Sequence, residues 1–328
     1  MPKTIDKAKR VVDFLSNGGS VFEIKDVEAI DDSAWHRISA KAYDFHLINS
    51  RKKRAEDEKK HNVLCTSNDE IKEILHLSSK LADYALSLPS VSTMHDLRTL
   101  QKLMLNMPSN EHQVIYTIER ITMNPKIRAL QKKGRFEHFS VFKEFSTIID
   151  AAVISYYRRN YISSYLTLVP VIEGILLRWL GYSGVGKKPE FEDLRNFFSN
   201  SHVRQPCPGN VLFYDVYIKA CDKLLKDHLY KPSDKGSAYS NFNRHLAAHL
   251  LSDSEFATQD NCVRLFNMID VMTEVFYYET HCNDPRFSLK REEFSLELEI
   301  YEDIITQSHN PRLRTPEQIL LGALVIVS

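Results

Sequence analysis

Apolar residues recur at intervals of three and four positions along most of this chain. That spacing places them on one face of an α-helix, so the pattern predicts an all-α fold. Near the start, Asp6 to Ser16 is predicted to be a short helix that ends at Asn17-Gly18-Gly19. The next stretch, Val21 to Val27, is the one segment for which we predict a strand.

Polar residues that begin helices and prolines that end them divide the rest of the first 130 residues. Asp31-Asp32-Ser33 is expected to cap a long helix, and the mixed charges of Arg51 to Lys60 indicate its solvated end or a linker. Ser67 begins the next helix. Helices around 93–107 and 110–123 each end before a proline. Because nothing here has catalytic spacing, residues 1 to 135 are interpreted as a helical accessory domain.

The segment Gln131 to Arg135 is predicted to be a domain boundary. Beyond it, phenylalanines recur every third residue from Phe136 to Phe145, which is typical of a core-facing helix, and this helix is expected to continue to Tyr157. We interpret this stripe as part of the hydrophobic core and not as a platform on which bases stack.

A helix from Tyr161 to Leu180 follows, bent at Pro170 and stopped by Gly181. Glu173 lies inside its most apolar stretch. Burying a carboxylate alone is costly, so we expect Glu173 to have a partner.

The remaining pattern predicts a short helix near 190–200, helices at 211–229, 241–250 and 259–281, and a tail of one or two helices. The predicted domains are therefore an N-terminal helical domain at 1–135, a helical bundle at 136–282 and a C-terminal helical extension at 283–328. The apolar end of this extension, 319–327, is expected to pack against the body or a partner.

Composition supports this picture and limits the function classes. The chain has 328 residues, 43% of them apolar, and a formal net charge of zero, so any nucleic acid must bind in a local groove. Its five scattered cysteines contain no Cys-x-x-Cys pair, which favours free thiols in a reducing cytoplasm. The N-terminus lacks a signal-peptide core and no run of 18 residues is apolar, so we predict no membrane span.

Candidate chemistry concentrates in Asn241 to Leu250, which contains an arginine, two histidines and two asparagines in an otherwise apolar helical frame. The guanidinium of Arg244 matches phosphate oxygens, and the imidazole of His249 can transfer protons near neutral pH. Arginine and histidine are also separated by a few residues elsewhere, as in Arg54 to His61 and Arg195 to His202. Only the pair in this frame follows a helix start signal.

Two other interpretations of these residues are open. His245 and His249 have the i, i+4 spacing of zinc ligands, but Leu246 stands where a metalloprotease needs glutamate and no third ligand is evident. Arg244 could instead pair with a core carboxylate such as Glu173 or Asp270 and orient helices. His249 could then be a core histidine that donates to a carbonyl.

The stretch Phe-Asn-Arg-His-x-x-x-His resembles the HEPN superfamily, the higher-eukaryote-and-prokaryote nucleotide-binding helical domains. Many members carry Arg-x4-6-His with a polar residue after the arginine. The helix at 161–177 is similar to the family's early core helix, and the one that begins at Thr258 is similar to the helix after the motif. The similarity covers about 140–281. The chain has Leu251 where members modified by a nucleotidyltransferase have tyrosine.

The resemblance implies a metal-independent endoribonuclease that needs no cofactor and works as a homodimer with two motif helices at one cleft. One imidazole accepts the 2′-hydroxyl proton, the oxygen attacks phosphorus, and a second imidazole protonates the leaving 5′-oxygen. His249 would be this acid or base, Arg244 would stabilise phosphoryl charge, and Asn243 and His245 would position the substrate. Glu173 would support Arg244.

The resemblance also implies RNA as the ligand and a toxin or antiviral defence setting, with an antitoxin or defence protein as a further partner. The alternative, from a different class, is a non-catalytic helical scaffold that binds nucleotide, RNA or protein. Solvent access of Arg244 and His249 discriminates between the two. A shared groove favours the nuclease, and burial in separate contacts favours the scaffold.

Overall fold

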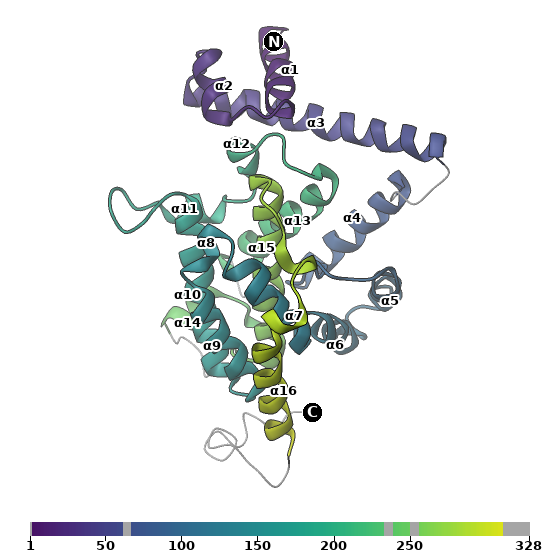
Figure 1. The fold of residues 1–328 in the computed structure, drawn as a ribbon, viewed down its shortest axis with the longest axis vertical. Helices are drawn as coiled ribbons and strands as arrows, with labels where there is room; N and C mark the ends of the chain where they lie inside the picture. Colours follow the sequence, from purple (N-terminus) through teal and green to yellow (C-terminus); the bar gives the residue numbers. More distant parts are fainter. Residues whose placement is uncertain (1, 62–66, 233–238, 250–255, 311–328) are drawn as a thin grey trace.

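The structure is a computed structural model that describes residues 2–61, 67–232, 239–249 and 256–310 (Figure 1). Every regular element in these ranges is helical, which confirms the all-α prediction. The first elements are α1 (Pro2–Ser16), α2 (Val21–Val27), α3 (Asp32–His61), α4 (Asn68–Asp83), α5 (Met94–Met104) and α6 (Glu111–Thr122).

The middle of the chain contains α7 (Pro125–Gln131), the π-helix η1 (Lys132–Phe136), α8 (Ser140–Lys143), α9 (Ser146–Tyr157), α10 (Tyr161–Trp179), α11 (Phe191–Arg195) and α12 (Ser201–Arg204). The last part contains α13 (Val211–Lys223), the π-helix η2 (Leu224–Leu229), the 3₁₀ turn η4 (Tyr239–Asn241), α14 (Arg244–His249), α15 (Gln259–Thr280), the 3₁₀ turns η5 (Pro285–Phe287) and η6 (Arg291–Glu293), and α16 (Ser295–His309).

The predicted strand at Val21–Val27 is wrong, because this segment is the helix α2. Ser20 and Glu23 form a capping box, in which the Ser20 hydroxyl accepts from the Glu23 amide and the Glu23 carboxylate accepts from the Ser20 amide. Two of its large apolar residues, Phe22 and Val27, are exposed by 75% and 71%, so no alternating face is buried. The local cap outweighs the strand preference of the valines.

The predicted helix start at Ser67 is confirmed, because the Ser67 hydroxyl accepts a backbone N–H of α4. Thr93 and Thr258 cap α5 and α15 in the same way. The charged run after Arg51 continues α3 as a solvated helix to His61 rather than forming a linker.

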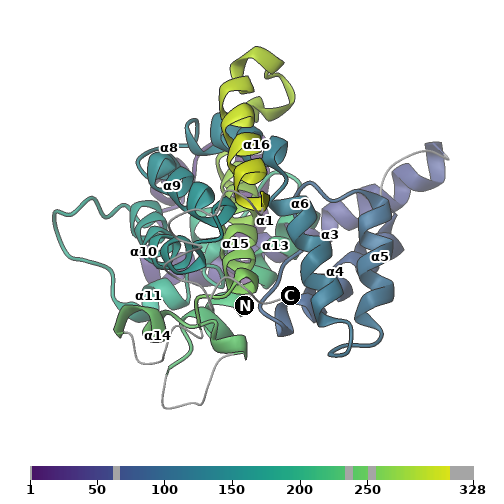
Figure 2. The same ribbon diagram turned by 90° about the horizontal axis from the view of Figure 1, so that it is seen from below.

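The centre of the fold is α15, which lies amid the other helices in both views (Figures 1 and 2). It packs against α6, α10 and α13, and it is buried around most of its circumference. A helix buried on all sides is the axis of a bundle and not one of its surface layers.

One hydrophobic core extends from Ile74 to Ile304, and it crosses the predicted boundary at 131–135. Gly134 and Arg135 are buried there, and Arg135 Nη2 lies 2.6 Å from Asp284 Oδ2 and 3.1 Å from Glu274 Oε1. Arg135 resembles part of a linker in the sequence because its carboxylate partners, Glu274 and Asp284, are about 140–150 residues away. A separate small cluster around Trp35 occupies the N-terminal end, where α1 and α3 pack together.

The aromatic stripe is part of the core, as predicted, but it does not form one helix. Phe136 of η1, Phe139 just before α8 and Phe142 of α8 are all buried, and α9 begins only at Ser146. The chain turns between these short elements so that the rings meet Phe276 of α15.

Helix α10 matches its prediction, with Pro170 inside it and Gly181 after it at φ +83°. By length and composition, it is the one helix among the described residues that could cross a membrane. It packs against α9 and α15 and buries Leu168, Ile172 and Ile175, so it serves here as a core helix of the bundle.

The described cysteines Cys207, Cys221, Cys262 and Cys282 are free thiols, in agreement with prediction. Cys65 lies outside the described residues, as do Leu250, Leu251 and the predicted apolar end at 319–327.

Candidate functional site

The start of α14 is fixed by the buried side chain of Asn243. Its Nδ2 donates to the carbonyl oxygens of His228, at 3.1 Å, and Lys231, at 3.0 Å. Its Oδ1 accepts the backbone N–H of His245 at 2.8 Å. Asn243 therefore acts on the site through the backbone, because it joins the first turn of α14 to the end of η2 and caps a helix that would otherwise leave its first amides unpaired.

Arg244 is the first residue of α14, and its side chain crosses to α10. Its Nε donates to Oε2 of Glu173 at 2.8 Å, so Glu173 has the partner that its apolar surroundings require. The two side chains are 24% and 18% exposed. No hydrogen bond with the described residues uses Nη1 or Nη2 of Arg244. The carboxylate thus orients the guanidinium and leaves its two terminal nitrogens available.

Two aromatic rings flank the Arg244 guanidinium. Its Cζ lies 5.7 Å from the ring centre of Tyr230 and 6.0 Å from that of Phe191, and the two rings meet edge to face at 5.4 Å. Tyr230 is buried and its hydroxyl has no hydrogen-bond partner among the described residues. Burial raises the pKa of Tyr230; the Glu173 carboxylate raises it further, and Arg244 lowers it. The phenol is therefore a neutral donor beside the ion pair.

The histidines of the motif are placed differently. The ring of His245 is half-buried and lies 6.2 Å from the ring of Phe191. His249 is the last described residue of α14, and its side chain lies outside what the structure describes. Of the two residues whose solvent access distinguishes a nuclease from a scaffold, the structure describes the side chain of Arg244. This side chain is partly exposed and is paired with Glu173.

A second cation approaches Glu173 from the loop between α10 and α11. Lys188 Nζ lies 3.7 Å from Glu173 Oε1, and it is 57% exposed. The loop contains Gly184 and Gly186, both at positive φ, and the exposed Lys187. Arg244 of α14 and Lys188 of this loop therefore bring positive charge to Glu173 from two elements. The loop before α11 and α14 lie on the same side of the bundle in Figure 2.

The geometry decides which carboxylate pairs with Arg244. Asp270 is not the partner of Arg244, because it pairs with Arg128 inside the core. Of the two predicted carboxylates, Glu173 makes the contact. Within the described ranges, no group of three or more His, Cys, Asp or Glu side chains is arranged to hold a metal ion.

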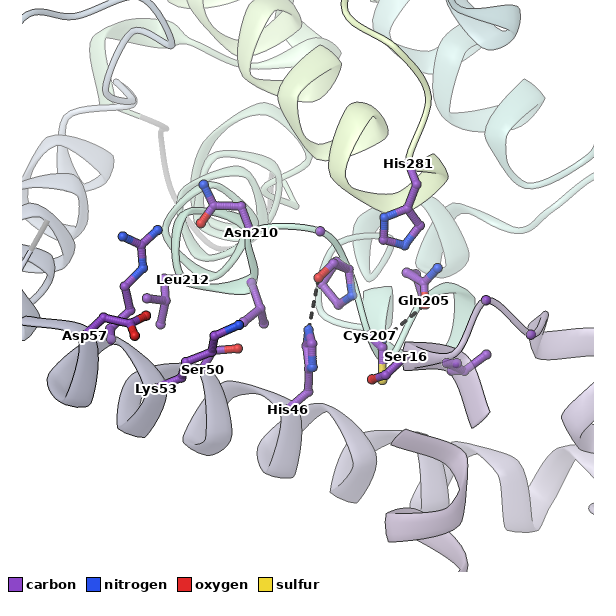
Figure 3. A pocket seen from close by; sticks show the side chains of 17 residues that line it. Ser16, His46, Ser50, Lys53, Asp57, Gln205, Cys207, Asn210, Leu212 and His281 are labelled. Atoms are coloured by element: carbon purple, nitrogen blue, oxygen red, sulfur yellow. Dashed lines mark hydrogen bonds between the residues drawn. The ribbon is translucent and has the colours of Figure 1, made fainter. Parts of the chain in front are cut away.

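A cavity of about 920 Å³ opens elsewhere in the molecule (Figure 3). It lies between α3 and the chain that leads into α13, and neither Arg244 nor Glu173 lines it. We place the candidate catalytic site at α14 because that is where the arginine, the carboxylate and the unpartnered phenol converge. The cavity is a separate feature.

Phe191, Tyr230 and Lys188 were not anticipated as parts of the site. They are 53, 14 and 56 residues before Arg244, and none carries a spacing signal toward it. The nearest clue is the Gly-Val-Gly-Lys-Lys segment at 184–188, whose glycines permit a tight basic loop.

Comparison with protein-family models, with curated proteins and with solved structures gives no match to this chain. What the site offers chemically is therefore a carboxylate-oriented arginine with two free terminal nitrogens, bordered by a neutral phenol, a half-buried imidazole and an exposed lysine.

Proposed function

We propose that this chain is a metal-independent endoribonuclease of the HEPN type, with Arg244 and His249 as its catalytic residues. The observation that carries the proposal is the orientation of Arg244 by Glu173. Because Nε is engaged, the two Nη groups are left to bind two oxygens of one phosphate, a geometry that lysine cannot reproduce.

In this proposal, His249 transfers the proton and Arg244 stabilises the charge that develops on the phosphoryl oxygens. The 2′-hydroxyl attacks the adjacent phosphorus, the bond to the 5′-oxygen breaks, and the products carry a 2′,3′-cyclic phosphate and a free 5′-hydroxyl. The transfer needs an acid and a base. A second copy of the chain, related by two-fold symmetry, would supply the second imidazole.

Positive charge near Arg244 is consistent with a polyanionic substrate. Lys188 and Lys187 lie on the loop beside the Arg244–Glu173 pair, although the whole chain has no net charge. RNA binding through a local basic groove requires this distribution. The setting that we propose, a toxin or antiviral defence system with a cognate partner protein, rests on the sequence resemblance alone. The cytoplasmic location that we propose rests on the scattered cysteines, which are free thiols where the structure describes them.

A non-catalytic scaffold is the second candidate, and one observation favours it. The Arg244 side chain is three-quarters buried and is satisfied by an ion pair and two aromatic rings without any ligand. A residue that joins α14, α10 and α11 in this way can be retained for the fold alone.

The decisive experiment incubates purified protein with end-labelled RNA in the presence and absence of EDTA, with the matching DNA as a control. Cleavage that survives EDTA, spares DNA and leaves cyclic phosphate ends is expected. His249→Ala should abolish it, whereas His95→Ala, at an exposed histidine of α5, should not. A His249→Ala protein that cuts RNA as fast as the parent would overturn the catalytic role of His249, and a parent protein that does not cut RNA would leave the scaffold as the better account.

The dimer is tested separately by light scattering at micromolar concentration. A two-fold dimer is expected if the second imidazole comes from another copy. A monomer that still cleaves RNA would exclude this arrangement and would make His245 the better second imidazole.

A further inference from the structure

The cavity near α3 is large enough to hold a small molecule. Its volume of about 920 Å³ is near the upper end of the range of roughly 300–1,000 Å³ that is typical of small-molecule sites. It lies between α3, the turn after α1, and the segment Gln205 to Leu212 (Figure 3). The motif at α14 contributes no residue to it.

The wall formed by α3 is polar where helix packing would require apolar residues. Earlier on this helix, Trp35, Ile38 and Ala42 are buried in the N-terminal cluster. The residues of α3 that line the cavity follow at helical spacing and are His46, Ser50, Lys53, Arg54 and Asp57. They share one face of the helix. A face that is turned toward the body of its own protein and is nonetheless polar is suited to a hydrophilic ligand.

Two of these residues are cations without partners. Within the part of the chain that the structure describes, the side chains of Lys53 and Arg54 make no hydrogen bond and no ion pair. Asp57 is the one carboxylate among the residues that line the cavity, so this end has an excess of positive charge. An unpaired guanidinium and ammonium side by side attract an anion.

The opposite wall adds to this positive potential. Helix α13 begins there, after Asn210, which has φ +42° and whose side chain does not cap the helix. Val211 and Leu212, in its first turn, line the cavity. The first amides of a helix have no intrahelical acceptor, so an anion placed between α3 and α13 would be favoured by both walls.

The other end of the cavity has no lysine, arginine or carboxylate among its lining residues, and His46, His281 and Cys207 lie there (Figure 3). His46 Nε2 lies 3.1 Å from the carbonyl oxygen of Pro208, to which it donates. Burial lowers the pKa of His46; the hydrogen bond to Pro208 raises it in part, and the neighbouring His281 lowers it again, so that the net shift is downward. Leu15 provides apolar surface at this end.

We propose that this cavity binds a small phosphorylated organic anion of mononucleotide size. Lys53, Arg54 and the first-turn amides of α13 would hold the phosphate. The uncharged body of the ligand would lie toward Leu15, Cys207 and His46.

The test measures binding to the full chain by titration calorimetry. The probes are AMP, GMP, CMP and UMP, with adenosine and inorganic phosphate as the separated halves of AMP. At least one mononucleotide should bind more tightly than inorganic phosphate, and adenosine should bind more weakly than AMP. The combined variant Lys53→Gln and Arg54→Gln should weaken mononucleotide binding at least about tenfold, because each lost charge-assisted contact has roughly that effect on affinity.

Matched variants make the result specific. Lys59→Gln with Lys60→Gln removes the same charge from the same helix outside the cavity and should change affinity by less than about twofold at physiological salt. Asn210→Asp places a carboxylate at the phosphate position and should abolish binding, while the fold survives because a negative charge is favourable at a helix N-terminus. Because Arg244 is itself proposed to bind phosphate, the titration is repeated with Arg244→Ala, and binding at the cavity should persist in this variant because Arg244 does not line it.

Three outcomes would overturn the proposal. The first is that none of the four mononucleotides and no phosphate binds at millimolar concentration. The second is that the Lys53 and Arg54 double variant binds mononucleotide with the same affinity as the parent. The third is that Arg244→Ala loses mononucleotide binding. The last outcome would place the ligand at α14 and would bear on that site instead. RNA cleavage enters none of these readouts, so failure here leaves the nuclease proposal untouched.

Discussion

Arg244 Nε donates a hydrogen bond to Glu173 Oε2 at 2.8 Å, which ties the first turn of α14 to the middle of α10. Glu173→Ala leaves a mostly buried guanidinium without its acceptor and should lower the free energy of unfolding by about 1–3 kcal/mol. Urea denaturation measures this. The control is Glu144→Ala, which breaks the more exposed Glu144–Arg178 pair and should cost about 0–1 kcal/mol. Equal losses would mean that the Arg244–Glu173 pair is structurally unimportant.

Lysine at position 244 separates the charge of Arg244 from the shape of its guanidinium. Arg244→Lys keeps a cation near Glu173, so the protein should remain folded. RNA cleavage should fall at least about tenfold, because an ammonium cannot bind two phosphate oxygens as a fork. Arg244→Ala should lose cleavage and also weaken RNA binding. Arg37→Ala, at an exposed arginine of α3, is the control. Full activity in Arg244→Lys would contradict the bidentate role.

Asn243 offers a test of how α14 is held. Asn243→Ala removes donors from the carbonyl oxygens of His228 and Lys231 and should lower stability by about 1–3 kcal/mol. Asn243→Asp keeps the acceptor for the His245 amide but sets a carboxylate oxygen against those carbonyls. We therefore expect it to be at least as destabilising. Hydrogen exchange of the α14 amides provides the local readout, and an Asp variant as stable as the parent would show that the two donor bonds contribute little.

Asp284 makes stability depend on pH at the acidic end. Burial raises the pKa of its carboxyl, but hydrogen bonds from Arg286 and Arg135 outweigh this and lower the pKa from 3.8 to about 2. Because the pKa of this carboxyl is lower in the folded protein than in the unfolded chain, the carboxylate stabilises the fold at pH values above the unfolded-state pKa. This stabilisation is lost as the pH falls from about 4 toward 2. The contribution is about 2 kcal/mol near neutrality.

Replacing this carboxyl by an amide removes the dependence. Asp284→Asn should be less stable than the parent by about 2 kcal/mol at pH 5, and the difference should shrink by about 1 kcal/mol at pH 3. Urea titrations at the two pH values measure it. A difference that stays constant between them would mean that Asp284 is not the titrating group.

Gly134 tests how closely η1 approaches η5. A Cβ added at Gly134 would lie 2.8 Å from the backbone nitrogen of Arg286, which cannot move freely. Gly134→Ala should therefore lower the free energy of unfolding by about 1–3 kcal/mol. Gly174→Ala is the matched control, since there the obstacle is the ring of Phe145 and alanine favours the helix by about 1 kcal/mol. Comparable melting temperatures for the two variants would contradict this account.

The sequence alone determined that the chain is helical, because apolar periodicity and caps are local signals. It did not show that the stripe from Phe136 to Phe145 is divided between short elements. The cap at Ser67, the proline in α10 and the stop at Gly181 were all predictable from neighbouring residues. The prediction from sequence was wrong at Val21–Val27, where the capping box of Ser20 and Glu23 favours a helix although the valines favour a strand. The need of Glu173 for a partner also followed from sequence, since burial cost depends on the surrounding apolar residues.

Only the tertiary structure decided which residues meet. Sequence left Glu173 and Asp270 as equal candidates for Arg244, and the packing of α10 against α14 selected Glu173 while Arg128 took Asp270. The expected boundary at 131–135 lies inside the core because Arg135 finds carboxylates about 140 residues away. Partners at such distances are set by how helices pack around α15, and no local pattern in the chain encodes that arrangement.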